Sequence, residues 1–326
     1  KLAEGLDRPI SEWGWFPDGK RLWFAVADRG SVSLFTVKRK GGEPKRILYR
    51  VFLTNIILSP DGKSFYATKH SLAGPPELFL YPADGGEPMQ LTDFNGELFK
   101  QFELATVEDF WWEGADGDKV HGYLLFPPGT SKEEKNPFLL GIHGGPQGAW
   151  GDRLHPRWNA QLFAAPGYVT LLANPRGSTG YGQKFTDQIS RDWGGRVYED
   201  LMNGVAALEE KGWIDPERMC AAGGSYGGYM ANWIMGHTDK FSCLISHAGV
   251  YDLKSKYGST DELWFPEWEF GGAPWESADY DKWSPSNFVE KFNTPMLVIH
   301  GEHDYRVPVS QAMQLFTALQ RRGVPS

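Results

Sequence analysis

Apolar and polar positions follow two different periods in the larger, C-terminal part of the chain. Continuous apolar runs, typical of strands buried on both faces, occupy 138–142, 168–173, 218–222, 243–246 and 296–300. Apolar residues at helical spacing follow three of these runs, in 197–211, 229–234 and 310–322. Before them, 107–112 and 120–126 alternate like an antiparallel strand pair. Strands alternating with helices predict a parallel, doubly wound sheet and the α/β fold class.

The first part of the chain repeats with a period of about 43 residues. Pro17–Lys20 is matched by Pro60–Lys63, and Gly41–Pro44 is matched by Gly85–Pro88. A period of this length with several short strands is typical of β-propeller blades. Two blades cannot cover both of their own faces. Residues 1–105 are therefore expected to be the C-terminal blades of a truncated propeller plus a connector, with 106–326 forming the sheet domain. A complete two-sheet β domain is the alternative.

A glycine-rich turn, Gly223-Gly224-Ser225-Tyr226-Gly227-Gly228, lies between an apolar run and a helical stripe. This is the G-x-S-x-G pattern of the nucleophile elbow on an α/β-hydrolase sheet. Glycines are needed because a Cβ near this strained turn would collide with the adjoining strand or helix. The helix N-terminus behind the serine favours developing negative charge. Ser225 is the candidate nucleophile, and a turn that only packs a helix on the sheet is the alternative.

The chain order expected for the catalytic residues points to a candidate acid but to no candidate base. On an α/β-hydrolase sheet the acid follows the nucleophile along the chain, and the histidine follows the acid. Asp304 lies in the loop after 296–300, where the acid is expected, with Glu302 and Asp252 as alternatives. No histidine follows Asp304, and the adjacent His303 would point away from it. The catalytic histidine is therefore expected beyond Ser326, in a chain truncated at both ends.

Two backbone N–H groups are expected to form the oxyanion hole. One is the N–H of Tyr226, which follows the nucleophile. The other comes from the loop His143-Gly144-Gly145-Pro146 after the third strand of the sheet, where either Gly144 or Gly145 could supply it. A plain tight turn is the alternative for this loop. The glycines at 177, 180 and 182 do not match a phosphate-binding pattern and indicate a loop beside the active site.

Composition excludes several classes of function. The net charge is −8 and no basic stripe is present, which argues against nucleic acid as a partner. No apolar run is long enough to span a membrane. Cys220 and Cys243 are the two cysteines, and their apolar surroundings predict buried free thiols rather than a disulfide. The sequence leaves the compartment open, and it is compatible with a homo-oligomer.

Four segments together resemble the prolyl oligopeptidase family of serine peptidases: His143–Pro146, Asn174–Gly182, Gly223–Gly228 and His300–Pro308. The branch they resemble is the acylaminoacyl-peptidase and dipeptidyl-peptidase-five group, and the aromatic segment 263–272 points to its dipeptidyl-peptidase-five side. The resemblance implies a β-propeller that covers an α/β-hydrolase domain and limits substrates to short peptides. It implies no metal and no cofactor.

The same resemblance assigns roles to five residues. Ser225 is the nucleophile, Asp304 is the acid, and the N–H groups of Tyr226 and Gly145 hold the oxyanion. Arg306, which lies two residues past the acid, matches the family arginine that holds a substrate carbonyl. The missing histidine is the one departure from the family pattern.

An aromatic and acidic segment precedes the last strand. Its aromatic residues are expected either to form a hydrophobic S1 wall or to pack a domain interface; they are Trp264, Phe265, Trp268, Phe270 and Trp275. The acids Glu262, Glu267 and Glu269 are interpreted as solvated charges, with binding of a peptide N-terminus as the alternative.

These features predict a serine peptidase that acts on short peptides through an acyl-enzyme on Ser225. It would release N-terminal dipeptides or acylated residues. One alternative is a carboxylesterase with the same triad, against which the propeller repeats count. The other is a non-catalytic propeller–hydrolase scaffold, which the missing histidine supports.

Overall fold

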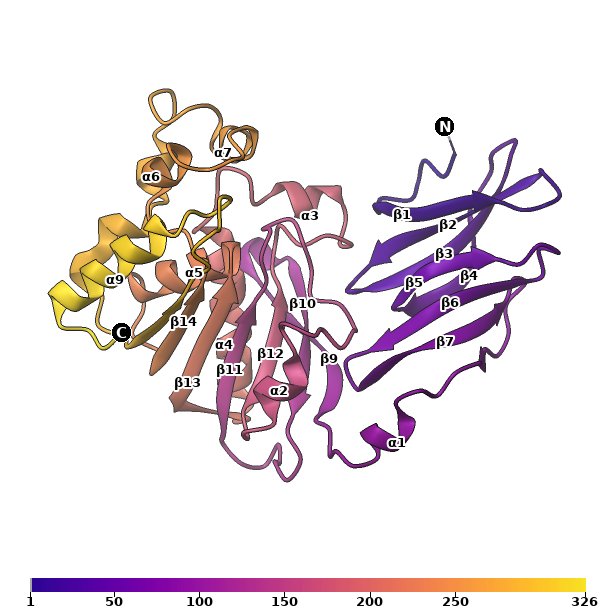
Figure 1. Cartoon of the computed structure of the whole chain (residues 1–326), viewed down its shortest axis with the longest axis horizontal. Helices are drawn as coiled ribbons and strands as arrows, with labels where there is room; N and C mark the ends of the chain where they lie inside the picture. Colours follow the sequence, from indigo (N-terminus) through magenta and orange to yellow (C-terminus); the bar gives the residue numbers. More distant parts are fainter. Residues whose placement is uncertain (1) are drawn as a thin grey trace.

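Two small antiparallel sheets stand beside a larger mixed sheet (Figure 1). The computed structural model describes residues 2–326. The first small sheet has the order β1 (Ile10–Trp15), β2 (Arg21–Asp28), β3 (Ser31–Lys38), β4 (Lys45–Val51). The second has the order β5 (Leu53–Leu58), β6 (Ser64–Ser71), β7 (Gly74–Pro82), β8 (Met89–Gln90).

The two small sheets are built on the same turn. A Pro-Asp-Gly-Lys segment precedes both β2 and β6, with Gly19 and Gly62 at φ values of 62° and 70°. In each turn the aspartate, Asp18 or Asp61, accepts the backbone N–H two residues further on, at 2.8 and 3.0 Å. The repeat therefore corresponds to one four-stranded sheet per unit, which is the strand count of a propeller blade.

The faces that the two small sheets turn to each other are apolar. Phe65 of β6 lies in their centre, with ring centroids 6.1 Å from Phe16 and 5.4 Å from Trp23. All three side chains are at most 6% exposed. Each sheet thus buries an aromatic face that it could not bury alone.

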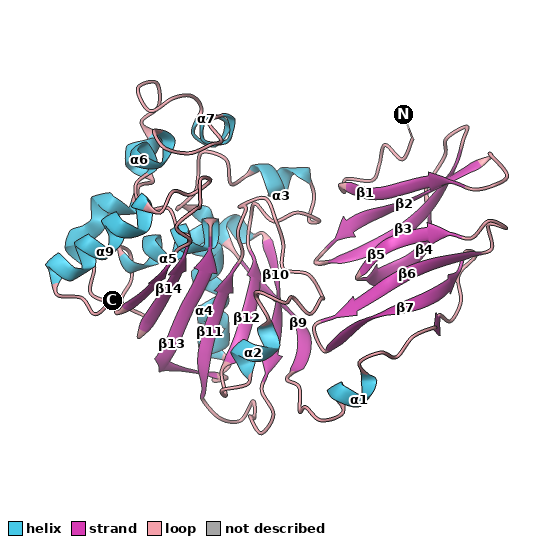
Figure 2. Ribbon diagram, viewed as in Figure 1, coloured by secondary structure: helices cyan, strands magenta, loops and turns pink. Residues whose placement is uncertain are grey.

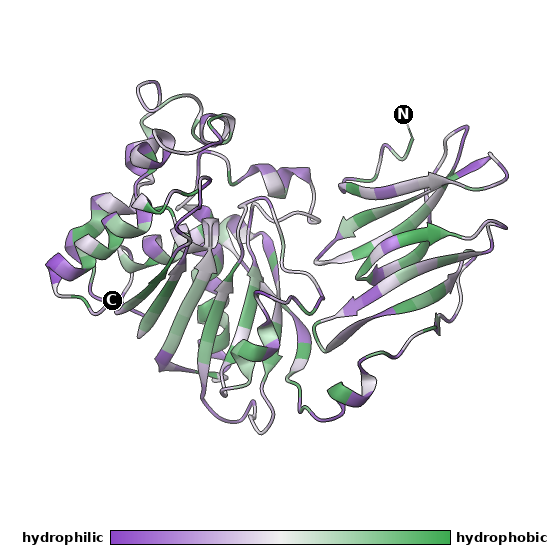
Figure 3. Cartoon of the chain, viewed as in Figure 1, coloured by the Kyte–Doolittle hydropathy of each residue, from purple (hydrophilic) through white to green (hydrophobic). Residues whose placement is uncertain are grey.

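The larger sheet has seven strands in the order β15-β14-β13-β11-β12-β10-β9. β9 and β10 form the antiparallel pair at one edge, β10 also runs antiparallel to β12, and the remaining neighbours are parallel. The strands are β9 (Thr106–Glu113), β10 (Lys119–Phe126), β11 (Asn136–Ile142), β12 (Val169–Asn174), β13 (Ile214–Gly224), β14 (Cys243–His247) and β15 (Met296–Ile299). Their largely apolar character is visible in Figure 3. The predicted doubly wound sheet of the α/β-hydrolase kind is confirmed.

Helices cover both faces of this sheet (Figure 2). On β10, Leu124 belongs to the core under α4 and α5, whereas its neighbours Tyr123 and Leu125 face the core under α2. The helices are α1 (Gly96–Phe99), α2 (Ala160–Ala164), α3 (Gln183–Asp187), α4 (Arg196–Glu210), α5 (Tyr226–Met235), α6 (Leu253–Tyr257), α7 (Trp264–Phe270), α8 (Asp279–Lys282) and α9 (Ser310–Arg322), with 3-10 turns at Ala115–Gly117 and Pro285–Lys291. Within residues 2–326, none of the helices combines the length and apolar character that crossing a bilayer requires.

A polar network joins the first small sheet to the edge of the large one. Arg50 of β4 donates to both carboxylate oxygens of Asp109 on β9, at 2.7 and 3.1 Å. Asp109 also contacts the buried His121 Nε2 at 2.8 Å, and His121 Nδ1 lies 2.5 Å from the hydroxyl of Tyr181. The hydrogen bond with His121 and the charge of Arg50 lower the pKa of Asp109. The carboxylate is thus held charged between the two parts of the chain.

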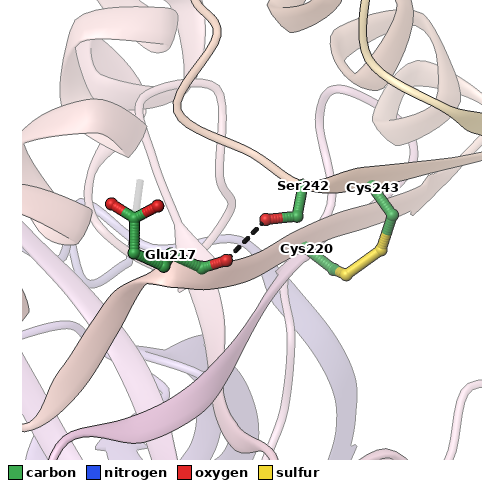
Figure 4. Close-up of a disulfide and its surroundings, with 4 residues drawn as sticks. All are labelled: Glu217, Cys220, Ser242 and Cys243. Atoms are coloured by element: carbon green, nitrogen blue, oxygen red, sulfur yellow. Dashed lines mark hydrogen bonds between the residues drawn. A yellow bond between two sulfur atoms is a disulfide. The ribbon is translucent and has the colours of Figure 1, made fainter.

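Cys220 and Cys243 form a disulfide, so the prediction of two free thiols is wrong (Figure 4). The two residues lie directly opposite each other on the parallel strands β13 and β14, with their Cα atoms 4.8 Å apart. Beside them, Ser242 donates a hydrogen bond to the carbonyl of Glu217. Strand register brings the sulfur atoms together, and register cannot be read from two separate apolar runs.

Removing the disulfide is expected to lower the free energy of unfolding by about 3 kcal/mol, because the bond closes a loop in the unfolded chain. The two cysteines are 23 residues apart. The test is urea denaturation of a Cys220→Ala/Cys243→Ala double variant. Reducing the wild-type protein should give the same shift in midpoint, and the double variant should not respond to reductant. Equal midpoints for the variant and the oxidised wild type would contradict this expectation.

Candidate active site

Ser225 occupies the sharp turn between β13 and α5. Its φ and ψ are 58° and −116°, a strained conformation for a residue with a side chain. The surrounding glycines are required by close packing: a Cβ on Gly223 would collide with the backbone of Gly227, and one on Gly227 with the carbonyl of Ile142. The N–H of Ser225 donates to the carbonyl of His247 at 2.9 Å. The turn therefore has the geometry that the G-x-S-x-G pattern predicts.

A cavity of about 480 Å³ opens beside Ser225. Asp304 lines the same cavity, although it lies on a different loop at the end of β15. Both loops leave the carboxyl ends of parallel strands, which meet at one edge of the sheet. The structure therefore brings the predicted nucleophile and the predicted acid to one site. Neither alternative acid, Glu302 nor Asp252, lines this cavity.

The loop that carries Asp304 is held by hydrogen bonds. Asp304 Oδ1 accepts the backbone N–H groups of Arg306 and Val307, both at 3.0 Å. His300 Nε2 donates to the carbonyl of Val307 at 2.6 Å and lies 3.7 Å from Asp304 Oδ2. Asp252, by contrast, caps α6 by accepting the N–H of Ser255. These bonds fix the position of the Asp304 carboxylate at the edge of the cavity.

Among the residues that the structure describes, no histidine is hydrogen-bonded to the hydroxyl of Ser225. His247 and His143 are near the turn and line the cavity. The ring of the buried His143 is already engaged, since Nδ1 donates to the carbonyl of Gly144 and Nε2 accepts from Ser178. Burial lowers the pKa values of both His143 and His247. The described site therefore contains the candidate nucleophile and the candidate acid, with no assigned base.

Backbone groups predicted to hold the oxyanion lie around Ser225. Tyr226 begins α5, and its buried hydroxyl donates to the carbonyl of Trp193 at 2.7 Å, which anchors the first turn of the helix. Gly144 packs directly on the nucleophile, since a Cβ built on it would lie 3.3 Å from the Cβ of Ser225. Gly145 follows at φ 126°, a conformation that favours glycine. The loop at 143–146 is thus next to Ser225, as the sequence predicts.

Arg306 does not line the Ser225 cavity. Its guanidinium is paired with Asp261, at 2.9 Å, and with Glu262. The backbone carbonyl of Arg306 also accepts a hydrogen bond from Thr260. The arginine is thereby tied to the segment between α6 and α7.

Glu269 is buried, so its interpretation as a solvated charge is wrong. Its side chain, only 1% exposed, accepts hydrogen bonds from Trp193 Nε1 at 2.7 Å, Gln147 Nε2 at 2.8 Å and Ser190 Oγ at 3.1 Å. Burial raises its pKa. Glu269 lies on the inner face of α7, and through Gln147 it links this helix to the loop after β11. A charge pattern alone could not show which face of a short helix is buried.

The aromatic segment divides into two groups. Phe270 is in the core, with its ring centroid 4.8 Å from that of Trp193. Trp264, Trp268 and Trp275 are 67%, 73% and 78% exposed. None of these four residues, and not Phe265 either, lines the cavity beside Ser225. In the described residues, the segment does not form the wall of that cavity.

One side of the cavity is formed by the loop between β11 and α2, which no sequence pattern predicted. Trp150, Arg153, His155, Arg157 and Trp158 of this loop line it. Trp158 packs on the elbow itself, because a Cβ on Gly224 would lie 2.9 Å from its ring. The loop has no regular period and no motif, so only its position in the fold identifies it.

Comparisons of the sequence with known proteins found a matching family model and several similar proteins. A model described as the prolyl oligopeptidase family matches residues 154–326, more than half of the chain. Dipeptidyl-peptidase 5 of Schizosaccharomyces pombe is 38% identical over 332 residues, which cover 100% of this chain and 48% of that protein. Dipeptidyl-peptidase 5 of Aspergillus fumigatus is 37% identical over 336 residues, covering 100% and 46%.

Solved structures share this fold over nearly the whole chain. Acylaminoacyl peptidase of Pyrococcus horikoshii superimposes with a TM-score of 0.88 at 29% identity, covering 99% of this chain and 51% of that one. A puromycin-hydrolysing peptidase of Mycobacterium tuberculosis matches with a TM-score of 0.79 at 24% identity, covering 96% and 48%. The chain therefore spans about half the length of the curated relatives and solved structures it matches.

Proposed function

Because the chain belongs to the prolyl oligopeptidase family, we propose that it is the part of a serine peptidase that carries the nucleophile Ser225. The observation that supports this most is the pairing of a strained elbow serine with Asp304 in one cavity. We propose further that residues 1–105 are the last blades of a longer propeller plus a connector, and that 106–326 form the peptidase domain. The face-to-face packing of the two small sheets supports this division.

The proposed reaction proceeds through an acyl-enzyme. Ser225 Oγ attacks the peptide carbonyl carbon and forms a C–O bond, while its proton passes to a histidine base oriented by Asp304. Backbone N–H groups of Tyr226 and Gly145 stabilise the oxyanion. The C–N bond breaks, the base returns the proton to the leaving amine, and water hydrolyses the ester in the same way. No residue of 2–326 is assigned as the base.

The proposed substrates are short peptides, from which N-terminal dipeptides or acylated residues are released. The names of the matched relatives, dipeptidyl-peptidase 5 and acylaminoacyl peptidase, support these two product classes over an esterase or a scaffold. We propose that Arg306 holds a substrate carbonyl. In the structure its guanidinium is paired with Asp261 and Glu262, so substrate would have to share or displace these partners.

The test is product analysis with the full-length gene product. Peptides with a free N-terminus, N-acetylated peptides and a simple p-nitrophenyl ester are incubated with the enzyme, and products are identified by mass spectrometry. We expect a dipeptide or an acylated residue from at least one peptide set. Hydrolysis of the ester without cleavage of any peptide would show an esterase instead, and turnover of none of them would support the scaffold.

A further inference from the structure

Three nitrogen-rich side chains on one loop face the cavity of Ser225. Arg153, His155 and Arg157 lie in the loop between β11 and α2, and all three line the cavity. The reaction proposed above assigns no role to them. Because all three belong to this one loop and line the cavity, two positive charges and an imidazole lie on the side of the cavity that the loop forms, here called the wall.

The positive charges of this wall have no carboxylate partner among residues 2–326. Neither Arg153 nor Arg157 forms an ion pair there, and the guanidinium of Arg153 lies over the ring of Phe52 at 5.5 Å. The neighbouring Asp152 does not line the cavity, and its carboxylate accepts the N–H of Leu72 at 2.8 Å. Asp304 is the one carboxylate on the described cavity lining, and its Oδ1 is already bonded to two backbone N–H groups.

His155 adds a directed donor to this wall. Its Nδ1 accepts the backbone N–H groups of Arg157 and Trp158, both at 3.1 Å. Burial, together with the charges of Arg153 and Arg157, lowers the pKa of His155. The neutral ring therefore carries its proton on Nε2, which is left to donate.

The wall and Ser225 border the same cavity. Trp158, the residue after Arg157, packs on Gly224 immediately before Ser225. Burial, and after it the charge of Arg157, lowers the pKa of His247, whose carbonyl accepts the N–H of Ser225. A group bound by Arg157 would thus lie in the same cavity as the bond to be cleaved.

We propose that Arg153, His155 and Arg157 form a carboxylate-binding subsite of the Ser225 cavity. Guanidinium groups bind carboxylates through paired N–H donors, and His155 supplies a further donor. The subsite would favour peptides with a carboxylate near the scissile bond, either the C-terminal carboxylate of a short peptide or an acidic side chain. This assignment of substrate class rests on the proposed peptidase function.

The turnover experiment uses the full-length protein and matched peptides. One pair differs only in a free or an amidated C-terminus, and a second pair carries Glu or Gln after the scissile bond. We expect kcat/KM to be about tenfold or more higher for the carboxylate member of at least one pair. The pair that shows the preference identifies the source of the carboxylate.

Substitutions at Arg157 distinguish loss of the subsite from a general loss of activity. Arg157→Ala should raise KM for the preferred peptide by about tenfold with little change in kcat, and leave its neutral partner unaffected. The KM of Arg157→Lys for the preferred peptide should lie between those of the wild type and Arg157→Ala, because lysine keeps the charge but loses the paired donors. Arg321→Ala removes an exposed arginine in the last turn of α9 and is the control. It should change neither KM nor kcat for either peptide.

Binding measurements test the subsite independently of catalysis. Calorimetry of the same peptide pairs with Ser225→Ala should show tighter binding of the carboxylate member, and this difference should shrink at high salt. Adding Arg157→Ala should abolish the difference. Equal affinity for both members of both pairs would overturn the subsite. Carboxylate-dependent binding with no peptide cleavage by the wild type would instead uphold the subsite and refute the peptidase function.

Discussion

Replacing Ser225 with alanine is expected to abolish peptide hydrolysis, with kcat falling by at least about 10⁴-fold. The strained turn between β13 and α5 fixes the serine backbone, so alanine can occupy the same position and the cavity should persist. What is lost is the oxygen that forms the acyl-enzyme, and no second hydroxyl is placed to replace it in the turn, which otherwise contains glycines and the inward-facing Tyr226.

Two measurements check this result on the full-length protein. A fluorophosphonate probe should label the wild type and fail to label Ser225→Ala, while urea denaturation should show that both proteins fold with similar stability. Ser242→Ala removes an exposed hydroxyl that bonds only the carbonyl of Glu217, and it should retain labelling and activity. Labelling that persists in Ser225→Ala would refute the assignment of the nucleophile.

Replacing Asp200 with asparagine is expected to lower the free energy of unfolding by about 3–5 kcal/mol. Asp200 of α4 and Arg176, which follows β12, have fully buried side chains. Two hydrogen bonds of 2.8 and 3.0 Å join the guanidinium to the carboxylate, which also accepts the backbone N–H of Ala115. Asparagine keeps the shape but leaves a buried cation without its charge partner, and the two other acids near Arg176 are 3.6 and 3.8 Å away.

Urea denaturation measures this effect, and an exposed pair provides the matched control. Lys254 and Asp281 also form an ion pair, but both side chains are largely exposed, so Asp281→Asn should cost less than about 1 kcal/mol. Adding Arg176→Met to Asp200→Asn should restore part of the loss by removing the unpaired charge. A loss for Asp200→Asn no larger than that for Asp281→Asn would show that the buried pair contributes little.

Local patterns predicted the elements of the large sheet closely. The helical stripe at 197–211 corresponds to α4 at Arg196–Glu210, and the apolar run at 138–142 corresponds to β11 at Asn136–Ile142. Buried strands and amphipathic helices impose their period on neighbouring residues, so the pattern is present within each segment. The repeat predicted several short strands per unit, and the structure shows that each small sheet has four.

The α/β fold, the repeat of the small sheets and the choice of Ser225 as candidate nucleophile could all be predicted from the sequence, because each depends on residues that are close along the chain. The elbow is a local turn, and glycines occur in it because any such turn leaves no room for a Cβ at their positions.

Contacts between segments that are distant along the chain could be known only from the folded structure. It paired Cys220 with Cys243, buried Glu269 against Gln147, held Arg306 to Asp261, and placed Arg153 and Arg157 on the cavity of Ser225. These contacts depend on strand register and on the paths of irregular loops, which are set by the packing of the whole chain. No periodic pattern within a segment predicts these contacts. The chemistry around Ser225 therefore depends on the fold and not on the motif alone.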